Sequence, residues 1–300
     1  MRTLLAFFTA FITLTAYGAD SDGPQTLNFG GTTRTFVVRT PTLPSRSDAR
    51  VPLVIVLHGG GGNADNAENM TGFTAKARKE RFIVVYPDGS GRLEDKLLTW
   101  NAGHCCAYAM KNDVDDVGFI NALLDELIRR YPVDAHRVYV TGMSNGAMMT
   151  HRLGIELSGR IAAIAPVVGT VFGDEAKPAH AVPALMINGM LDKNVPHEGG
   201  APGGRGARGW DGTPTQPASA QVEFWAKANG CRAFPDKIEN GKWARLQSSC
   251  PDGSEVQLYL VKDNGHAWPG GQAGSRRGDA PGTAMNATDV IWEFFKSHSK

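Results

Sequence analysis

The segment from Arg137 to Gly146 constrains the fold more than any other part of this chain. It reads Arg-Val-Tyr-Val-Thr-Gly-Met-Ser-Asn-Gly, so a β-branched and aromatic run stops in a Gly-x-Ser-x-Gly motif. The residues that follow, 147–157, can all be helical. A buried strand, a sharp turn and a helix form the context in which this motif lifts its serine out of a sheet. The two glycines carry no Cβ that would collide in so tight a turn.

Ser144 is therefore a candidate nucleophile. We expect it at the N-terminus of the helix, where free N–H groups favour developing negative charge. The alternative is an ordinary turn between a strand and a helix, with Ser144 as a capping residue.

Apolar runs and amphipathic segments alternate along the rest of the chain. This alternation predicts an α/β fold with a doubly wound, mainly parallel sheet and covering helices, built as one domain over residues 20–300. Residues 34–39 are expected to form an edge strand, and residues 89–113 and 198–217 to form loops. Further strands are expected at 53–57, 82–86, 138–141, 161–168, 184–187 and 256–261, and helices at 66–79, 114–131, 147–157, 219–228 and 284–296.

The N-terminus is typical of an export signal. Arg2 precedes an apolar run from Leu4 to Leu14, which is too short to span a bilayer, and small residues around Ala19 suit cleavage after Gly18 or Ala19. We expect residues 1–19 to be a signal peptide and the mature protein to be secreted or periplasmic. The alternative is a buried N-terminal helix.

The composition of the chain argues against some partners. Its net charge of +1 gives no overall field for nucleic acid or anionic lipid, and no later stretch is apolar enough to cross a membrane. No His/Cys cluster has the spacing of zinc ligands, so we expect no metal and no cofactor. The sequence leaves the oligomeric state open.

Candidate catalytic groups follow other strands of the expected sheet. Ligands of such sheets meet the carboxyl ends of the strands. His266, between Gly265 and Ala267 after the last strand, is the candidate base, and Asp192 is the candidate acid that orients it. The chain order Ser144, Asp192, His266 is that of the α/β-hydrolases.

Each of these residues has an alternative interpretation. His266 could be a solvated loop histidine, and Asp192 a turn-forming aspartate. Asp174 and Asp211 are rival acids, but no strand directly precedes either of them.

The glycine run after the strand at 53–57 is a candidate oxyanion site. We expect one donor to be the N–H of Asn145, which follows the candidate nucleophile, and the other to be that of Gly60, with Gly59 second. His58 stands at the strand end before these glycines, which suits work near the oxyanion better than the role of base. The alternative is a flexible turn.

Several motifs match a known family in the same order along the chain. The set resembles the polyhydroxybutyrate depolymerase-like and feruloyl-esterase-like family of secreted α/β-hydrolases over most of residues 27–296. The motifs are Leu57-His58-Gly59-Gly60-Gly61, Tyr86-Pro87-Asp88-Gly89, Trp100-Asn101-Ala102-Gly103-His104-Cys105-Cys106, Val114-Asp115-Asp116-Val117-Gly118-Phe119, Gly142-Met143-Ser144-Asn145-Gly146 and Gly265-His266-Ala267-Trp268-Pro269-Gly270-Gly271. The resemblance implies a serine carboxylesterase acting on hydroxyalkanoate, feruloyl or acetyl esters.

Other residues in these motifs have expected roles. We assign His58, Trp100 and Trp268 to substrate binding, because a ring beside the catalytic histidine supplies flat apolar area. The two tryptophans could instead be core anchors. Asp115 and Asp116 precede an apolar helix face, which favours a helix cap and a structural hydrogen bond over a metal pair.

An exported chain with four cysteines is expected to be oxidised. Cys231 and Cys250 lie in one late segment and are expected to pair. Cys105 and Cys106 are adjacent, so they could pair directly or with the late cysteines.

Taken together, the sequence predicts a secreted serine carboxylesterase for short or oligomeric esters, including fragments of polyesters or plant polymers. The loop 198–217 is rich in Gly, Pro and Arg and has Trp210 as its one large apolar group, so it offers little surface for adsorption on lipid. Two alternatives are a serine peptidase of the same fold and a non-catalytic polymer-binding protein.

Overall fold

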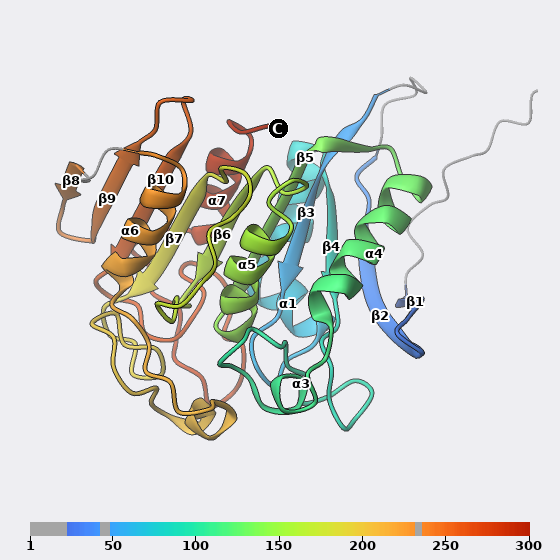
Figure 1. Cartoon of the computed structure of the whole chain (residues 1–300), viewed down its shortest axis with the longest axis horizontal. Coiled ribbons are helices and arrows are strands. Elements are labelled where there is room, and N and C mark those ends of the chain that lie inside the picture. Colours follow the sequence, from blue (N-terminus) through green and yellow to red (C-terminus); the bar gives the residue numbers. More distant parts are fainter. Residues whose placement is uncertain (1–22, 43–48, 232–235) are drawn as a thin grey trace, which may run out of the picture.

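The computed structural model describes residues 23–42, 49–231 and 236–300, so the expected signal peptide lies outside the described residues. The chain forms one 10-stranded sheet in the order β1-β2-β4-β3-β5-β6-β7-β10-β9-β8 (Figure 1). The strands are β1 (Gln25–Phe29), β2 (Thr32–Arg39), β3 (Val51–Leu57), β4 (Ile83–Pro87), β5 (Val133–Met143), β6 (Ala163–Val167), β7 (Ala184–Gly189), β8 (Asp236–Glu239), β9 (Trp243–Ser249) and β10 (Glu255–Val261).

The centre of the sheet is parallel. Neighbouring strands from β4 through β3, β5, β6 and β7 to β10 all pair in parallel, whereas β1, β2, β8 and β9 add antiparallel pairs at the two ends. Every residue of β3, β4, β6 and β7 is buried, as expected for strands covered on both faces. The expected doubly wound, mainly parallel sheet is confirmed.

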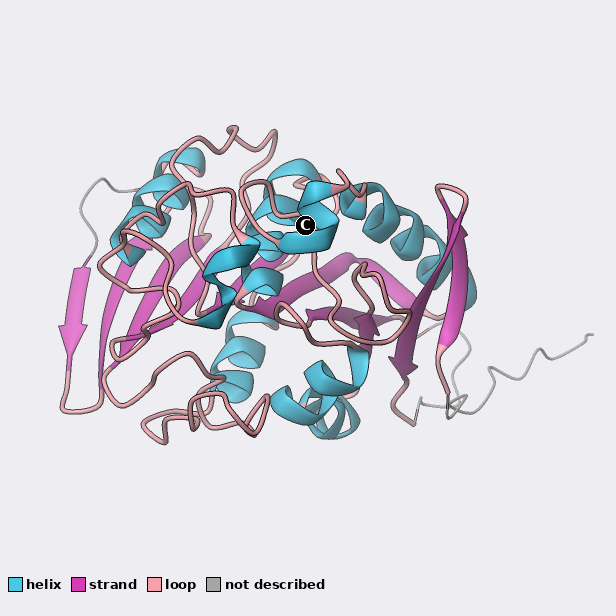
Figure 2. Cartoon of the chain, turned by 90° about the horizontal axis from the view of Figure 1, so that it is seen from below, coloured by secondary structure: helices cyan, strands magenta, loops and turns pink. Residues whose placement is uncertain are grey.

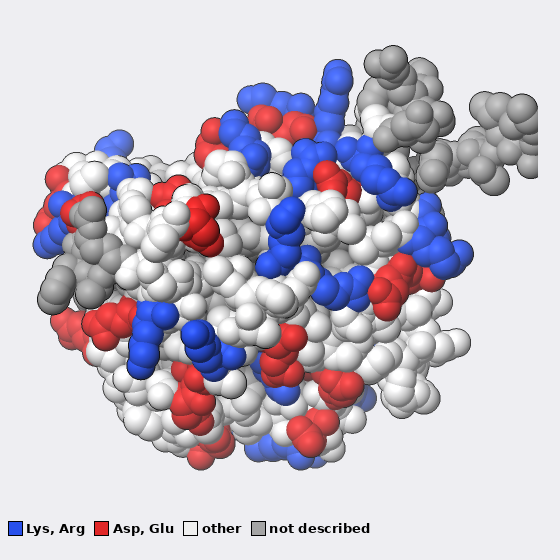
Figure 3. Space-filling view, turned by 45° about the horizontal axis from the view of Figure 1, so that its top comes forward, with Lys and Arg blue, Asp and Glu red and all other residues white. Residues whose placement is uncertain are grey.

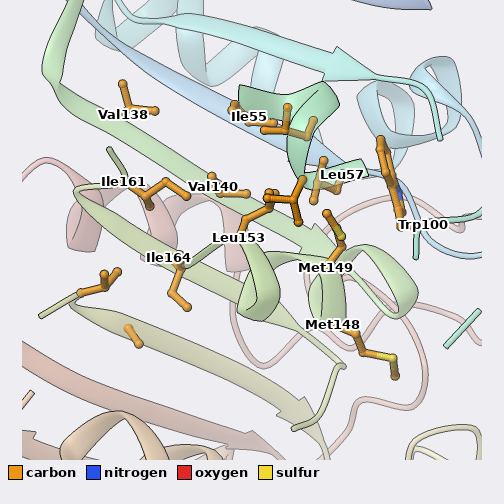
Figure 4. Packing of buried hydrophobic residues seen from close by; sticks show 14 of the residues in the cluster. Ile55, Leu57, Trp100, Val138, Val140, Met148, Met149, Leu153, Ile161 and Ile164 are labelled. Carbon is orange, nitrogen blue, oxygen red and sulfur yellow. The ribbon is translucent and has the colours of Figure 1, made fainter. Parts of the chain in front are cut away.

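Helices cover both faces of the sheet (Figure 2). They are α1 (Ala64–Thr71), α2 (Phe73–Glu80), α3 (Ala107–Lys111), α4 (Asp116–Arg130), α5 (Asn145–Glu156), α6 (Ala218–Ala228) and α7 (Ala287–Phe295), with a 3₁₀ helix at Arg205–Gly209. One core cluster lies under α4, α5 and α6 and includes Val140, Leu153 and Ile164 (Figure 4). The other lies under α1, α2 and α7 and includes Tyr139 and Phe295.

Some elements differ from the expectations. The strand at 34–39 is not at the edge, because β1 pairs with it on the outer side. The helix expected at 66–79 is two helices, because Gly72 adopts a left-handed conformation (φ 68°) that ends α1. The expected loop 89–113 contains α3, and β8 and β9 extend the sheet beyond β10.

The surface carries charges of both signs. Basic and acidic side chains alternate over the face shown in Figure 3, in keeping with the net charge of +1. Among the described residues, no helix has the length and apolar character needed to span a membrane.

Candidate active site

Ser144 lies in the turn between β5 and α5 with a backbone conformation that non-glycine residues rarely adopt (φ 57°, ψ −119°). The chain can turn this sharply because two neighbours are glycines. A Cβ on Gly142 would lie 2.6 Å from the carbonyl oxygen of Gly146, and a Cβ on Gly146 would lie 2.5 Å from that of His58. The motif therefore builds the strained elbow that its sequence predicts.

Ser144, His266 and Asp192 meet although they are far apart in the sequence. His266 Nε2 lies 2.8 Å from Ser144 Oγ, and His266 Nδ1 lies 2.7 Å from Asp192 Oδ2. Because a carboxylate only accepts hydrogen bonds, Nδ1 carries the proton and Nε2 is free to accept from the serine hydroxyl. The arrangement has the geometry of a nucleophile, a base and an orienting acid.

Asp192 is held in place from its other side. Its side chain is fully buried, and its Oδ1 accepts hydrogen bonds from the N–H groups of Asn194 (2.8 Å) and Val195 (2.9 Å). These bonds satisfy the buried carboxylate and aim Oδ2 at His266. The turn that Asp192 forms is thus part of how it is positioned, so the turn-forming interpretation and the acid role are compatible.

Two residues that the sequence analysis missed shape the His266 loop. Asn264 is fully buried, and its Nδ2 donates to the carbonyl oxygens of Gly265 (2.8 Å) and Ala267 (2.9 Å), on either side of the histidine. Asp279 accepts a hydrogen bond from the N–H of His266 at 2.7 Å. The only signal for Asn264 in the sequence was its place in the loop three residues after the end of β10, and Asp279 had none.

The glycine loop after β3 lies against the first turn of α5. A Cβ on Gly59 would lie 3.6 Å from Ser144 Cβ, and one on Gly60 would lie 3.6 Å from Asn145 Cβ. Within the described part of the chain, no hydrogen bond uses the N–H of Gly60 or Asn145. Both donors are thus available beside Ser144, where the sequence analysis expected oxyanion donors.

The expected role of His58 in binding substrate is not supported by its surroundings. Its ring is fully buried, its Nε2 accepts from the N–H of Gly89 (3.0 Å), and its Nδ1 donates to the carbonyl oxygen of Gly59 (2.8 Å). Burial lowers the pKa of His58 to about 4, so the ring is neutral in the tautomer that these bonds require. A ring enclosed in this way does not contact substrate; it fixes the glycine loop instead.

Trp100 and Trp268 are core anchors. Both are fully buried; Trp100 Nε1 donates to the carbonyl oxygen of His58 (3.1 Å), and Trp268 Nε1 donates to Thr288 Oγ1 (3.0 Å). Their expected role in binding substrate directly is therefore replaced by the alternative that the sequence left open.

The paired aspartates before α4 have structural roles. Asp115 caps α4 by accepting from the N–H of Gly118 (2.8 Å). Asp116 is fully buried and bonds Arg34 (2.8 Å) and the N–H of Asn101 (2.8 Å), although burial raises the pKa of its carboxyl. Asp116 thus ties the loop that carries Asn101 to β2.

The rival acids face a different histidine. Asp174 Oδ2 lies 2.8 Å from His104 Nε2, and Asp211 Oδ2 lies 2.6 Å from His104 Nδ1. Neither is bonded to His266, so the position of the acid in this site belongs to Asp192.

The two early cysteines pair with each other, and so do the two late ones. The bond between Cys231 and Cys250 is present as expected, and Cys105 is bonded directly to Cys106. Within the described ranges, no group of three or more His, Cys, Asp or Glu side chains could hold a metal ion.

A mainly parallel sheet, a serine elbow after its central strand, and an acid and a histidine after later strands define an α/β-hydrolase. The chain belongs to the esterase PHB depolymerase family, whose model matches residues 40–197.

Individual relatives and solved structures agree with this class. The chain is 31% identical over 234 residues to feruloyl esterase B of Piromyces equi, covering 76% of this chain and 41% of that protein. It is 31% identical over 128 residues to poly(3-hydroxyalkanoate) depolymerase C of Paucimonas lemoignei, covering 42% of this chain and 30% of that protein. The chain thus spans less than half the length of either relative.

The acetyl xylan esterase from Aspergillus awamori has a similar fold. It superimposes with a TM-score of 0.62 at 16% identity, covering 91% of this chain and 99% of that one.

Proposed function

We propose that this protein is a serine carboxylesterase in which Ser144 is the nucleophile, His266 the general base and acid, and Asp192 the orienting acid. The observation that carries the proposal is the hydrogen-bonded chain from Ser144 Oγ through His266 to the buried Asp192, placed at a strained elbow. Membership of a family of esterases supports the same chemistry.

The reaction follows from this geometry. His266 Nε2 takes the proton of the Ser144 hydroxyl as Oγ attacks the ester carbonyl carbon. The N–H groups of Gly60 and Asn145 stabilise the oxyanion of the tetrahedral intermediate. The bond to the alcohol then breaks, and His266 returns the proton to the departing oxygen.

The second half of the reaction releases the acid. The acyl group is left on Ser144 as an ester, and water attacks it while His266 accepts the water proton. Collapse of the second tetrahedral intermediate breaks the bond to Oγ and restores the serine hydroxyl. Asp192 keeps the ring in the required tautomer and stabilises the imidazolium in both halves.

We propose short or oligomeric esters as substrates, of hydroxyalkanoate, feruloyl or acetyl type. The loop 198–217 supports this choice, because its one large apolar side chain, Trp210, is partly buried and packs edge-on against Phe172 (5.8 Å between ring centroids), so the loop offers little apolar surface to lipid. Fragments of polyesters or plant polymers fall within this class.

We further propose export, with residues 1–19 as the signal peptide and residues 20–300 as one catalytic domain. Two disulfides among the described residues support an oxidising compartment. Sequencing the N-terminus of the mature protein tests the cleavage site, and a terminus that retains Met1 contradicts export by this signal.

A hydrolysis screen tests the function. Wild type, Ser144→Ala and the matched control Ser275→Ala, which changes an exposed loop serine, are assayed on p-nitrophenyl esters, methyl ferulate, hydroxybutyrate oligomers and polymer film. We expect Ser144→Ala to lose on the order of a million-fold in turnover and Ser275→Ala to keep full activity. Circular dichroism verifies folding.

Other outcomes point to other functions. Cleavage of peptides but not esters would favour the peptidase alternative, and polymer binding without hydrolysis would favour a binding protein. Near-wild-type turnover by folded Ser144→Ala would refute the nucleophile.

A further inference from the structure

A cleft of about 290 Å³ runs along α5, near the lower end of the range for small-molecule sites. Its walls come from the loop after β4, from α5 and from the loop after β6. The residues that matter here are Ala102, His104, Met148, Ile155 and Phe172. Ser144, His266 and Asp192 do not line this cleft.

The near end of the cleft is one helical turn from Ser144. The N–H of Met148 donates to the carbonyl oxygen of Ser144 at 3.0 Å, and one turn of an α-helix rises only about 5.4 Å. The loop after β6 also approaches this turn, since a Cβ on Gly169 would lie 2.5 Å from Ala147 Cβ. The near end of the cleft and Ser144 thus lie within about one helical turn of each other.

The charged side chains that line the cleft all have hydrogen-bond partners within the protein. His104 is bonded to Asp174 and Asp211, and Arg152 Nε bonds Glu156 at 2.6 Å. Glu175 accepts hydrogen bonds from the N–H groups of Phe172 and Gly173.

The rest of the lining is mainly apolar, and its two polar side chains, His151 and Thr170, are hydrogen-bonded to other residues. Met148, Ile155 and Phe172 contribute apolar side chains, and the His104 ring lies edge-on to Phe172 with the centroids 4.9 Å apart. A ligand with a net charge would find no unpaired partner here, so the cleft fits an uncharged apolar group.

The position of the cleft relative to His266 indicates whether it would hold the acyl group or the alcohol of the ester. The departing alcohol must lie within reach of His266 Nε2, which returns the proton. The His266 loop runs on to Trp268 in the core under α1, α2 and α7, whereas Met148 and Phe172 belong to the core on the α5 face. An ester whose alcohol lies at His266 can therefore extend its acyl group toward the α5 face.

We propose that the cleft along α5 is the acyl subsite, and that it takes uncharged acyl groups longer than acetyl with their alkyl or aryl carbons against Met148, Ile155 and Phe172. This inference rests on the proposed esterase function. In this proposal the residues that line the cleft determine which acyl groups are accepted, and they take no part in breaking the ester bond.

A cleft-filling substitution tests the subsite. Ala176 lines the cleft and is exposed, so Ala176→Trp narrows the space without removing a core contact. Ala179 is exposed in the same loop outside the cleft lining, so Ala179→Trp is the matched control. The substrates are p-nitrophenyl acetate, butyrate, hexanoate and 3-phenylpropanoate, with ethyl butyrate added to vary the alcohol.

We expect Ala176→Trp to lower kcat/KM for the longer acyl esters about tenfold or more, since a change of one methylene in an apolar pocket already alters it about tenfold. Acetate hydrolysis should stay within about twofold of wild type, and the loss should be equal for ethyl and p-nitrophenyl butyrate. Ala179→Trp should match wild type on every ester.

The acetate assay separates the two levels of the proposal. If wild type hydrolyses no ester, the proposed function fails. If wild type hydrolyses esters, three results for Ala176→Trp would refute the acyl subsite and leave the esterase function standing. They are an unchanged acyl profile, an equal loss for acetate and hexanoate, and a changed preference for the alcohol.

Ile155→Ala, which enlarges the far end of the cleft, gives a second test. We expect kcat/KM for the 3-phenylpropanoate ester to rise relative to that for acetate.

Discussion

Asn145 and Trp100 are joined by reciprocal hydrogen bonds. The N–H of Trp100 donates to Asn145 Oδ1 at 2.7 Å, and Asn145 Nδ2 donates to the carbonyl oxygen of Trp100 at 3.0 Å. The same carbonyl oxygen accepts from the N–H of Cys106 at 3.0 Å. The first residue of α5, whose own N–H is the expected oxyanion donor, is thus fixed by its side chain to the loop that carries the adjacent cysteines.

Asn145→Ala should lower kcat although the backbone donor remains. The substitution leaves the buried N–H of Trp100 without its partner, at a cost of about 1–3 kcal/mol, and frees the turn to shift, while the carbonyl oxygen of Trp100 keeps the bond from Cys106. A shift of about 1 Å can cost up to a hundredfold in rate, so we expect a fall of that order in kcat with little change in KM. Asn112→Ala, at an exposed position, is the control. Unchanged kcat in a folded Asn145→Ala protein would argue against this role.

Asp192→Asn should abolish most activity while Asp174→Asn should not. An amide in place of Asp192 no longer fixes the proton on His266 Nδ1, and comparable changes in serine hydrolases cost about 10⁴ in kcat. Asp174 bonds His104, so its substitution should leave turnover of p-nitrophenyl acetate within about twofold of wild type. Steady-state kinetics on both variants decides between the acids, and the reverse ranking would reassign the role.

His104 should make stability depend on pH. Its nitrogens both face carboxylates, but a neutral imidazole has only one N–H to donate, so the two bonds together need the charged ring. The bond to Asp174, together with that to Asp211, raises the pKa of His104 above its ordinary value, although burial acts against this.

A raised folded-state pKa adds stability that is fully present below the unfolded-state pKa and is lost as pH rises through the folded-state value. The Tm difference between wild type and His104→Gln should therefore shrink as pH rises from about 6. Thermal melts in matched buffers measure it. Thr213, which lies 3.0 Å from His104 Nδ1, does not titrate, so Thr213→Val should keep the pH dependence. A constant Tm difference across this range would contradict the titration.

Replacing both Cys231 and Cys250 by Ser should lower stability without changing catalysis. The bond closes a loop with a sequence separation of 19, for which about 3 kcal/mol is typical in the chain-entropy account. Cys250 follows Ser249, the last residue of β9, which pairs with Glu255, the first residue of β10. The disulfide thus lies at the start of β10, whereas His266 follows the end of that strand. We expect Tm to fall on the order of 5–10 °C with unchanged kcat at 25 °C. A loss of kcat in the folded double variant would show that the bond acts on the site.

The sequence by itself determined the features that depend on local chemistry. The elbow follows from Gly142 and Gly146, because any Cβ at those positions would collide with neighbouring backbone. The parallel centre of the sheet follows from continuous apolar runs such as β3, which can be stable only when covered on both faces. The candidate triad follows from residues in the loops that leave such strands, because parallel strands bring their carboxyl ends to the same side of the sheet.

Only the tertiary structure decided which partners distant groups find. Nothing local distinguishes a tryptophan that lines a pocket from one that fills a core, and packing buried both Trp100 and Trp268. Asp174 and Asp211 reach His104 because loops after different strands meet above α5, and β8 and β9 exist as strands because β10 offers an edge to pair with. These outcomes depend on contacts between segments far apart in the chain, whereas the tight turn of the elbow depends on the steric exclusion between Gly142 and Gly146, four residues apart.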